Sequence, residues 1–248
     1  MDKLTQVTTP ATTISYSYDA LGRRISRTAG SSTANYMLDG NSDLTDYEID
    51  GNGKLTGAYL RGADGLISQT DYTGQSPITA GYLYNPHGDT SATTDQNGNV
   101  TGTYRYDSFG NPTGTNNLAD AYTGKWQRNT DDATGLIKMG AREYDPALGR
   151  FVSADSLQGD PFDPQRRNRY AYATNNPLSK YDLTGLETTE TISAGQITYT
   201  STDLDGDPNS SLSMPDYHPS QTDTTLADIG DYSTKELPDQ STDNLRNL

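Results

Sequence analysis

Residues 140–186 read GAREYDPALGRFVSADSLQGDPFDPQRRNRYAYATNNPLSKYDLTGL, and this stretch decides how the chain is organised. Turn-forming pairs recur along it and are separated by short aromatic or apolar pieces. These pairs are Asp145-Pro146, Leu148-Gly149, Asn176-Pro177 and Thr184-Gly185. A chain that reverses this often can bring residues that are distant in sequence into one small site. We therefore expect Arg142, Asp155 and Asp182 to lie together.

Residues 1–114 contain a repeated unit that resembles aromatic–x–aromatic–Asp–x–x–Gly. The units are YSYDALGRR (16–24), NYMLDGNSD (35–43), GYLYNPHGD (81–89) and TYRYDSFGN (103–111), with turn positions at Asp19, Asp39, Asn85 and Asp107 and a degenerate unit near Asp64. A period of about 20–25 residues is typical of stacked strand–turn–strand units. The alternating aromatic residues lie on one face of a strand, the Asp caps the turn, and the Gly supplies a positive φ. Asn52-Gly53 and Asn97-Gly98 predict further hairpins.

The long stretch and the repeats together resemble the Rhs/YD-repeat family and its Rhs repeat-associated core. The resemblance is carried by REYDPALGRFVSADS (142–156), RYAYATNNP (169–177) and DLTGL (182–186), in this order, and by the upstream repeats. It implies an all-β fold in which a curled YD-repeat sheet over 1–114, a segment of a hollow shell, ends in a turn-rich core domain over 115–186. The chain departs from the family pattern at Glu143, Ser156 and Leu183.

The resemblance implies chemistry at Arg142, Asp155 and Asp182, which match the family's self-cleavage residues, and a cut between Leu186 and Glu187. Two Asp held close together do not both ionise, so one accepts a proton from water while the other donates one to the leaving amine. Such an intramolecular aspartic-type autoprotease needs no cofactor and no metal. A structural alternative stays open, in which Asp182 begins an Asx turn, Asp155 pairs with an arginine, and the core keeps its fold without cleaving.

Three other charged segments resemble functional sites, but the residues around them favour a structural interpretation. Asp131 and Asp132 lie in a polar NTDDATG segment, which predicts a solvated turn. The arginines of QRRNRY at 165–170 form the basic run of the chain, and we expect them to pair internally with acids. The DLDGDPN segment at 203–209 begins like an EF-hand loop, but its sixth position is Pro208 where Gly is required and its twelfth is Met214 where Glu is required.

Composition changes after Leu186. Residues 187–248 are rich in Thr, Ser and Asp and hold 12 acidic and 2 basic residues. Few of these residues are apolar and they show no sustained period, so we expect an acidic, disordered tail.

The whole chain has 31% hydrophobic residues, a net charge of −15, no Cys, and 18 Tyr against 3 Phe and 1 Trp. Tyr suits sheets that are packed on one face and wet on the other.

Charge and hydropathy limit which partners and which localisation we expect. The acidic charge argues against nucleic-acid binding, and no apolar run approaches the length of a membrane span. The chain opens without a signal-peptide pattern, while the family resemblance implies a secreted or cell-surface bacterial protein. The expected partners are upstream shell repeats of the same or a companion chain, the tail as cargo, and a cell-surface or secretion-system partner.

Three functions stay open at this point. The first is the C-terminal part of a shell protein whose core closes the shell and cleaves after Leu186 to release the tail, as in toxin delivery. The second is a non-catalytic YD-repeat surface or wall-associated interaction protein. The third, a carbohydrate-binding β protein, rests on exposed Tyr alone.

Overall fold

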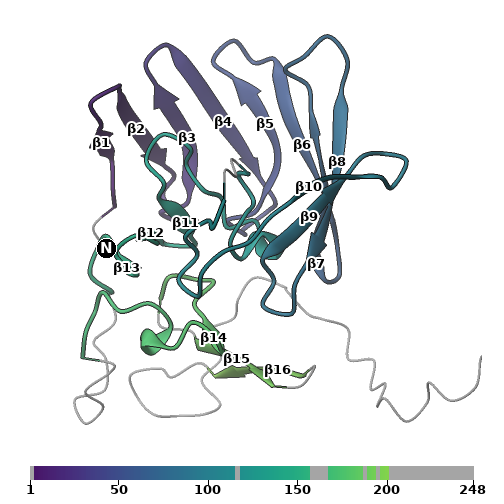
Figure 1. The fold of residues 1–248 in the computed structure, drawn as a ribbon. Coiled ribbons are helices and arrows are strands. Elements are labelled where there is room, and N and C mark those ends of the chain that lie inside the picture. Colours follow the sequence, from purple (N-terminus) through teal and green to yellow (C-terminus); the bar gives the residue numbers. More distant parts are fainter. Residues whose placement is uncertain (1–2, 115–117, 157–166, 187–188, 194–195, 201–248) are drawn as a thin grey trace, which may run out of the picture. The chain divides into compact units, whose positions relative to one another are not determined.

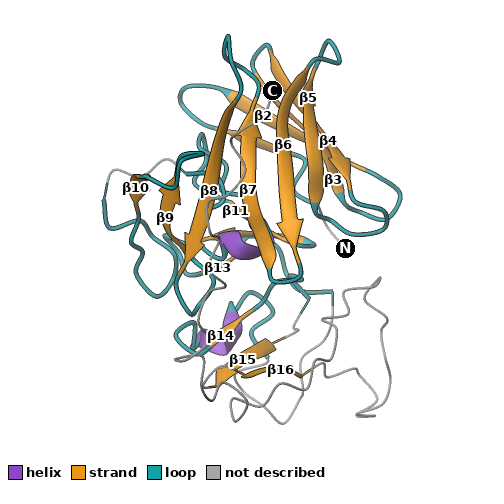
Figure 2. Ribbon diagram, turned by 90° about the vertical axis from the view of Figure 1, so that its right-hand side faces the viewer, coloured by secondary structure: helices purple, strands orange, loops and turns teal. Residues whose placement is uncertain are grey.

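The computed structural model describes residues 3–114, 118–156, 167–186, 189–193 and 196–200. Its largest element is a ten-stranded antiparallel sheet in which each strand pairs with the next along the chain (Figures 1 and 2). The strands are β1 (Gln6–Thr8), β2 (Thr13–Tyr18), β3 (Arg24–Ala29), β4 (Ser32–Leu38), β5 (Thr45–Asp50), β6 (Leu55–Gly62), β7 (Gly65–Asp71), β8 (Ile78–Tyr84), β9 (Thr90–Thr94) and β10 (Val100–Thr103). The sheet curls as it proceeds from β1 to β10, as the repeats predict.

Alternation along the strands gives this sheet an inner and an outer face. In β2, Ile14 and Tyr16 are buried while Ser15 and Ser17 are exposed. In β6 and β7 the outward side chains of Leu60 and Ile67 are at least half exposed. The all-β class and the curled YD-repeat sheet are thus confirmed.

The repeated Asp caps its turn as expected. The Asp107 Oδ1 accepts the backbone N–H groups of Phe109 and Asn111, both at 2.9 Å, and the same arrangement is found at Asp19. In the unit at 85–89, Asn85 plays this part. The turns at Asp50 and Asp95, which the unit pattern did not single out, use the same bonds in the predicted Asn-Gly hairpins. The degenerate unit near Asp64 is a tight hairpin between β6 and β7.

The rest of the described chain forms a core of short strands and turns. It contains β11 (Ile137–Met139), β12 (Arg142–Asp145) and β13 (Arg150–Phe151) in one sheet, β14 (Lys180–Tyr181), and the 3-10 turns η1 (Gly124–Trp126) and η2 (Ala173–Asn175). Aromatic rings fill it: Tyr144 and Tyr172 lie 4.4 Å apart between centroids, and Trp126 and Tyr181 lie 4.7 Å apart. In the described part of the chain, no helix is long and apolar enough to span a membrane.

Two further strands continue the sheet of β14: β15 (Thr189–Ser193) pairs with β14, and β16 (Gln196–Thr200) pairs with β15. They fall in the segment for which the sequence predicts disorder, so its first part includes paired strands, while 201–248 lies outside the described residues. All described residues belong to one compact unit over Met1–Pro215. The division at 114/115 and 186/187 therefore stays a prediction.

Polar contacts hold the core against the inner face of the sheet. Arg27 of β3 forms a bidentate pair with Asp131, with N–O distances of 2.6 and 2.9 Å, and the Tyr16 hydroxyl donates to the same carboxylate at 2.8 Å. The expectation of a solvated turn is therefore wrong for Asp131, which is 4% exposed. It holds for Asp132, whose side chain is 84% exposed. Long-range pairing with β3 buries Asp131, and the local sequence carries no sign of it.

Turn glycines allow the core to approach the sheet closely. Gly88, in the turn between β8 and β9, has φ +85°, and a Cβ at this position would overlap the ring of Trp126. Gly98, in the turn between β9 and β10, has nearly the same φ, +82°, with nothing within 4 Å of a Cβ. Both positions require a positive φ, but only Gly88 has a side chain, that of Trp126, where a Cβ would lie.

This pair separates backbone strain from close packing. We expect Gly98→Ala to lower the free energy of unfolding by about 1–2 kcal/mol, the cost of a left-handed conformation. Gly88→Ala should lower it by about 1–3 kcal/mol more, since the added methyl also displaces the Trp126 ring. Urea denaturation of the two variants measures the difference, and equal losses would contradict the packing role of Gly88.

Candidate functional site

The predicted residues meet where two turns approach each other. Arg142 begins β12 and pairs with Met139 across the turn that contains Gly140. The second turn, residues 182–185, lies against it, and Ala141 donates its N–H to the Thr184 carbonyl at 2.8 Å. Gly140 (φ +52°) and Gly185 (φ +66°) make this approach sterically possible, because a Cβ on either would collide with the backbone of the opposite turn.

Arg142 binds both acids through one nitrogen. Its Nη2 lies 2.8 Å from Oδ2 of Asp155 and 3.2 Å from Oδ2 of Asp182. These distances limit the separation of the two carboxylate oxygens to at most about 6 Å. The Arg142 and Asp155 side chains are 1% exposed and that of Asp182 is 5% exposed. The three residues predicted from the sequence therefore share one buried site.

The other contacts of the guanidinium fix its plane. Nε of Arg142 donates to the Gly185 carbonyl at 2.5 Å, and Nη1 donates to the Arg169 carbonyl at 3.0 Å. The guanidinium carbon lies 3.6 Å from the ring centroid of Phe151, which adds a cation–π contact. With these bonds and the two carboxylates, Arg142 connects β12, β13, the segment at 169 and the turn at 182–185.

Asp182 is held by its own turn. Its Oδ1 accepts the Gly185 N–H at 2.7 Å and the Thr184 hydroxyl at 3.3 Å, and the Leu186 N–H also bonds to the carboxylate. This is the Asx-type turn considered as the structural alternative. Burial raises the pKa of Asp182 above its usual range, since the cost of desolvating the charge outweighs the opposing effects of Arg142 and the backbone donors.

Asp155 is positioned by Arg169. The Asp155 N–H donates to the Arg169 carbonyl at 2.9 Å, and the Arg169 guanidinium donates back to the Asp155 carbonyl through Nε at 2.7 Å and through Nη2. For Arg169 the expectation of pairing with an acid was wrong, because it binds the acid's backbone oxygen instead. Sequence reasoning did not foresee this role, although the RYAYATNNP match begins at Arg169. Arg166, which the same expectation covered, lies outside the described residues.

The arrangement places acid–base groups beside the expected cleavage point. Leu186 is partly buried, whereas Glu187 lies outside the described residues. Arg142 bonds to the carbonyl of Gly185, one peptide before the Leu186–Glu187 bond. In aspartic-type chemistry, a pair of carboxyls of which one keeps its proton activates water and protonates a leaving amine, and the raised pKa of Asp182 beside Asp155 is compatible with that requirement. Among the described residues, no three His, Cys, Asp or Glu side chains gather in a way that could hold a metal ion.

Comparison with known proteins agrees with this architecture. The family model described as the teneurin YD-shell matches residues 2–178. The tRNA3(Ser)-specific nuclease WapA of Bacillus spizizenii is 34% identical over 187 residues, and the tRNA nuclease WapA of Bacillus subtilis is 33% identical over 187 residues. Both matches cover 74% of this chain, which spans about 8% of the length of these relatives.

Two solved structures share the fold. The crystal structure of TcdB2-TccC3-Cdc42 matches with a TM-score of 0.55 and 20% identity, and that of TcdB2-TccC3 with a TM-score of 0.55 and 18% identity. Each match covers 74% of this chain and 10% of the solved chain.

Removing the guanidinium should leave two buried carboxylates without their shared cation. We expect Arg142→Met to lower the free energy of unfolding at pH 7 by about 3–5 kcal/mol. The loss should shrink toward pH 4, because burial raises the pKa of Asp182 and its protonation removes one of the two unpaired charges. Chemical denaturation at both pH values checks this.

The control for that measurement is Arg150→Met, since Arg150 lies on β13 with its side chain exposed. Its stability should change by no more than about 0.5 kcal/mol. Similar losses in the two variants, or a loss in Arg142→Met that does not depend on pH, would contradict the role given to Arg142.

Proposed function

This chain belongs to the Rhs/YD-repeat shell family, and we propose that its core cleaves the chain between Leu186 and Glu187. The observation that carries the proposal is the single Arg142 nitrogen that contacts both Asp155 and Asp182 at 2.8 and 3.2 Å. Such a bridge holds two acids close enough to act on one water molecule and one peptide bond.

The protonation states follow from burial and from the neighbouring charges. Two buried carboxylates beside one guanidinium carry one negative charge in excess, and binding one proton neutralises the group. Asp182 is the better site for that proton, because burial raises its pKa. In this assignment Asp155, whose Oδ2 lies nearer to Arg142 Nη2, is the base that takes a proton from water. The oxygen of that water adds to the carbonyl carbon of Leu186, and Asp182 then donates its proton to the nitrogen of Glu187 as the Leu186–Glu187 bond breaks.

Attachment to the same chain favours the reaction. Leu186 is four residues after Asp182, and its N–H is already bonded to the Asp182 carboxylate. Well-oriented intramolecular reactions reach effective molarities of roughly 10⁵–10⁸ M. A modest acid–base pair is therefore sufficient for one turnover.

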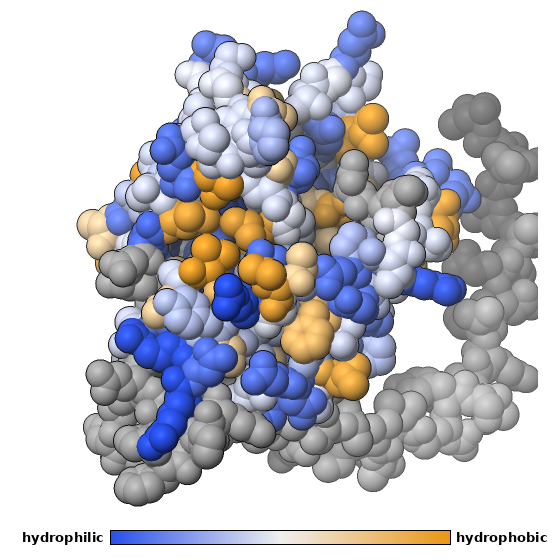
Figure 3. All heavy atoms as spheres, turned by 60° about the vertical axis from the view of Figure 1, so that its left-hand side comes forward, coloured by the Kyte–Doolittle hydropathy of each residue, from blue (hydrophilic) through white to orange (hydrophobic). Residues whose placement is uncertain are grey.

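The wider role proposed here is delivery of a released tail by a secreted or cell-surface shell. The WapA relatives are named as tRNA nucleases, and in this proposal the segment after Leu186 is the part that is released. The outer edge of β1 pairs with no strand among the described residues, so it can extend the sheet into upstream repeats of this or a companion chain. Figure 3, which brings this side of the molecule forward, shows apolar residues gathered within a mostly polar face.

A second function, a non-catalytic shell or surface module, is favoured by one specific observation. The bonds of Arg142 to the Gly185 and Arg169 carbonyls and to the two acids are all structural bonds as well. A core built in this way would hold its fold without cleaving. Cleavage itself separates the two functions.

The purified chain should separate into two fragments, one ending at Leu186 and one beginning at Glu187, as seen by intact mass. Asp155→Asn and Asp182→Asn should each slow the cut by at least about 100-fold, since an amide neither takes up nor donates the required proton. The rate should fall as the pH rises through the raised pKa of Asp182, because its proton is then lost.

Two acids outside the pair serve as controls. Asp145 accepts the Leu148 N–H in the turn after β12, and Asp132 is exposed. Asp145→Asn and Asp132→Asn should both cleave at the wild-type rate. If the wild-type chain keeps its full mass during long incubation from acidic to neutral pH, the protease is excluded and the structural module stands.

A further inference from the structure

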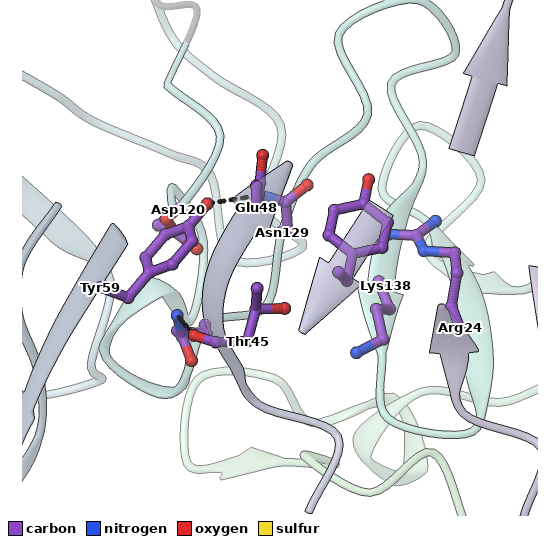
Figure 4. A pocket seen from close by; sticks show the side chains of 9 residues that line it. Arg24, Thr45, Glu48, Tyr59, Asp120, Asn129 and Lys138 are labelled. Carbon is purple, nitrogen blue, oxygen red and sulfur yellow. Dashed lines mark hydrogen bonds between the residues drawn. The ribbon is translucent and has the colours of Figure 1, made fainter. Parts of the chain in front are cut away.

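A small cavity lined by polar and charged residues lies between the inner face of the sheet and the core, away from Arg142. It has a volume of about 20 Å³, and a water-sized guest needs roughly 10–15 Å³. Strands β3 to β6 form one side of it, and the segments around Asp120 and Lys138 form the other. Figure 4 shows Asp120, Glu48, Tyr59 and Asn129 gathered at one end, with Arg24 and Lys138 at the other.

The acidic end lacks a cation. Asp120 is 1% exposed, and its Oδ2 has no hydrogen-bond partner among the described residues. Glu48 accepts the Tyr59 hydroxyl at 2.6 Å. Neither Glu48 nor Asp120 forms an ion pair within the described part of the chain, although a buried carboxylate near a partly buried one is costly without such a pair.

The cations at the other end are bound to different acids. Arg24 pairs with Glu143 at 3.3 Å. The Lys138 amine donates to the backbone oxygen of Asp43 at 2.8 Å and contacts its carboxylate at 3.2 Å. These side chains therefore line the cavity and act on Asp120 and Glu48 from a distance, but neither forms an ion pair with them.

We propose that the cavity binds one small monovalent cation, such as K⁺, Na⁺ or NH₄⁺, between Asp120 and Glu48. Thr45, Tyr59 and Asn129, whose side chains carry oxygen atoms, line the same space, and oxygen donors suit hard cations. With two carboxylates rather than three, and room for one water-sized guest, the site fits a single positive charge better than a divalent ion. The cation would connect β5 to the segment before η1 and so fasten the core to the sheet.

A proton competes for the same position. Burial, followed by the neighbouring Glu48, raises the pKa of Asp120 to about 7, while Lys138 lowers it. Burial also raises the pKa of Glu48, opposed by the Tyr59 hydrogen bond and by Arg24. The other titratable groups that face this end are Tyr36, Tyr59, Tyr82 and Tyr84. The cation should therefore bind above about pH 7 and be displaced by protons at pH 5.

Thermal unfolding at pH 8 tests the site. At equal ionic strength, KCl, NaCl or NH₄Cl should raise the Tm over choline chloride, whose cation is too large for the cavity. We expect a saturable rise of about 2–4 °C with the ion that fits. The rise should disappear at pH 5.

Asp120→Asn should abolish the response, because a neutral amide of the same shape does not hold the ion. In choline chloride at pH 8 this variant should melt above the wild type, since it buries no unpaired charge. Asp132→Asn, at an exposed position, should respond like the wild type. A wild-type Tm that is the same in all four salts, or a response kept by Asp120→Asn, would overturn the proposal.

Ion binding can also be measured directly, without a stability assay. Crystals of the wild-type chain soaked in RbCl should show an anomalous peak beside Asp120 and Glu48. A cavity filled only by water under these conditions would overturn the cation site, even if Asp120→Asn fails to fold. Neither experiment depends on cleavage after Leu186.

Discussion

The core depends on the burial of one guanidinium. Arg142 contacts two carboxylates and two backbone carbonyls, and these groups come from segments as far apart as 155, 169 and 182–185. A buried arginine is costly unless its donors are satisfied. Because those acceptors are brought together by three separate reversals of the chain, satisfying Arg142 requires that all three form. The turn glycines at 140 and 185 follow from the same requirement, since the two turns meet backbone to backbone.

A chain with 31% hydrophobic residues builds this structure by concentrating its aromatic rings. Tyr122, Tyr144, Phe151, Tyr172 and Tyr181 are nearly fully buried in the core. The face between core and sheet is instead held by ion pairs, such as Arg27 with Asp131 and Arg24 with Glu143. Aromatic rings supply the buried apolar surface inside the core. Directional polar contacts fix how the core is positioned against the ten-stranded sheet. The cavity at Asp120 lies within this polar layer.

The repeats and turn signals predicted the parts of the fold that are local. The Asp-capped turns at Asp19 and Asp107 and the hairpins at Asn52-Gly53 and Asn97-Gly98 need only neighbouring residues, so their sequence is sufficient. The gathering of Arg142, Asp155 and Asp182 was also predicted, through the family pattern and the frequency of turns. The burial of Asp131 and the backbone bonds of Arg169 were not, because their partners are fixed by packing between distant segments.

The same geometry explains how one arrangement can serve both stability and chemistry. A guanidinium held by four acceptors and an aromatic ring has little freedom to move, so the two acids beside it are also held in place. Catalytic groups that are fixed before the reaction need not be reorganised during it. Burial raises the pKa of Asp182 and thus favours a retained proton on the carboxyl that is tied to Leu186. The desolvation that makes the site costly to fold is the property that would allow one acid to donate while the other accepts.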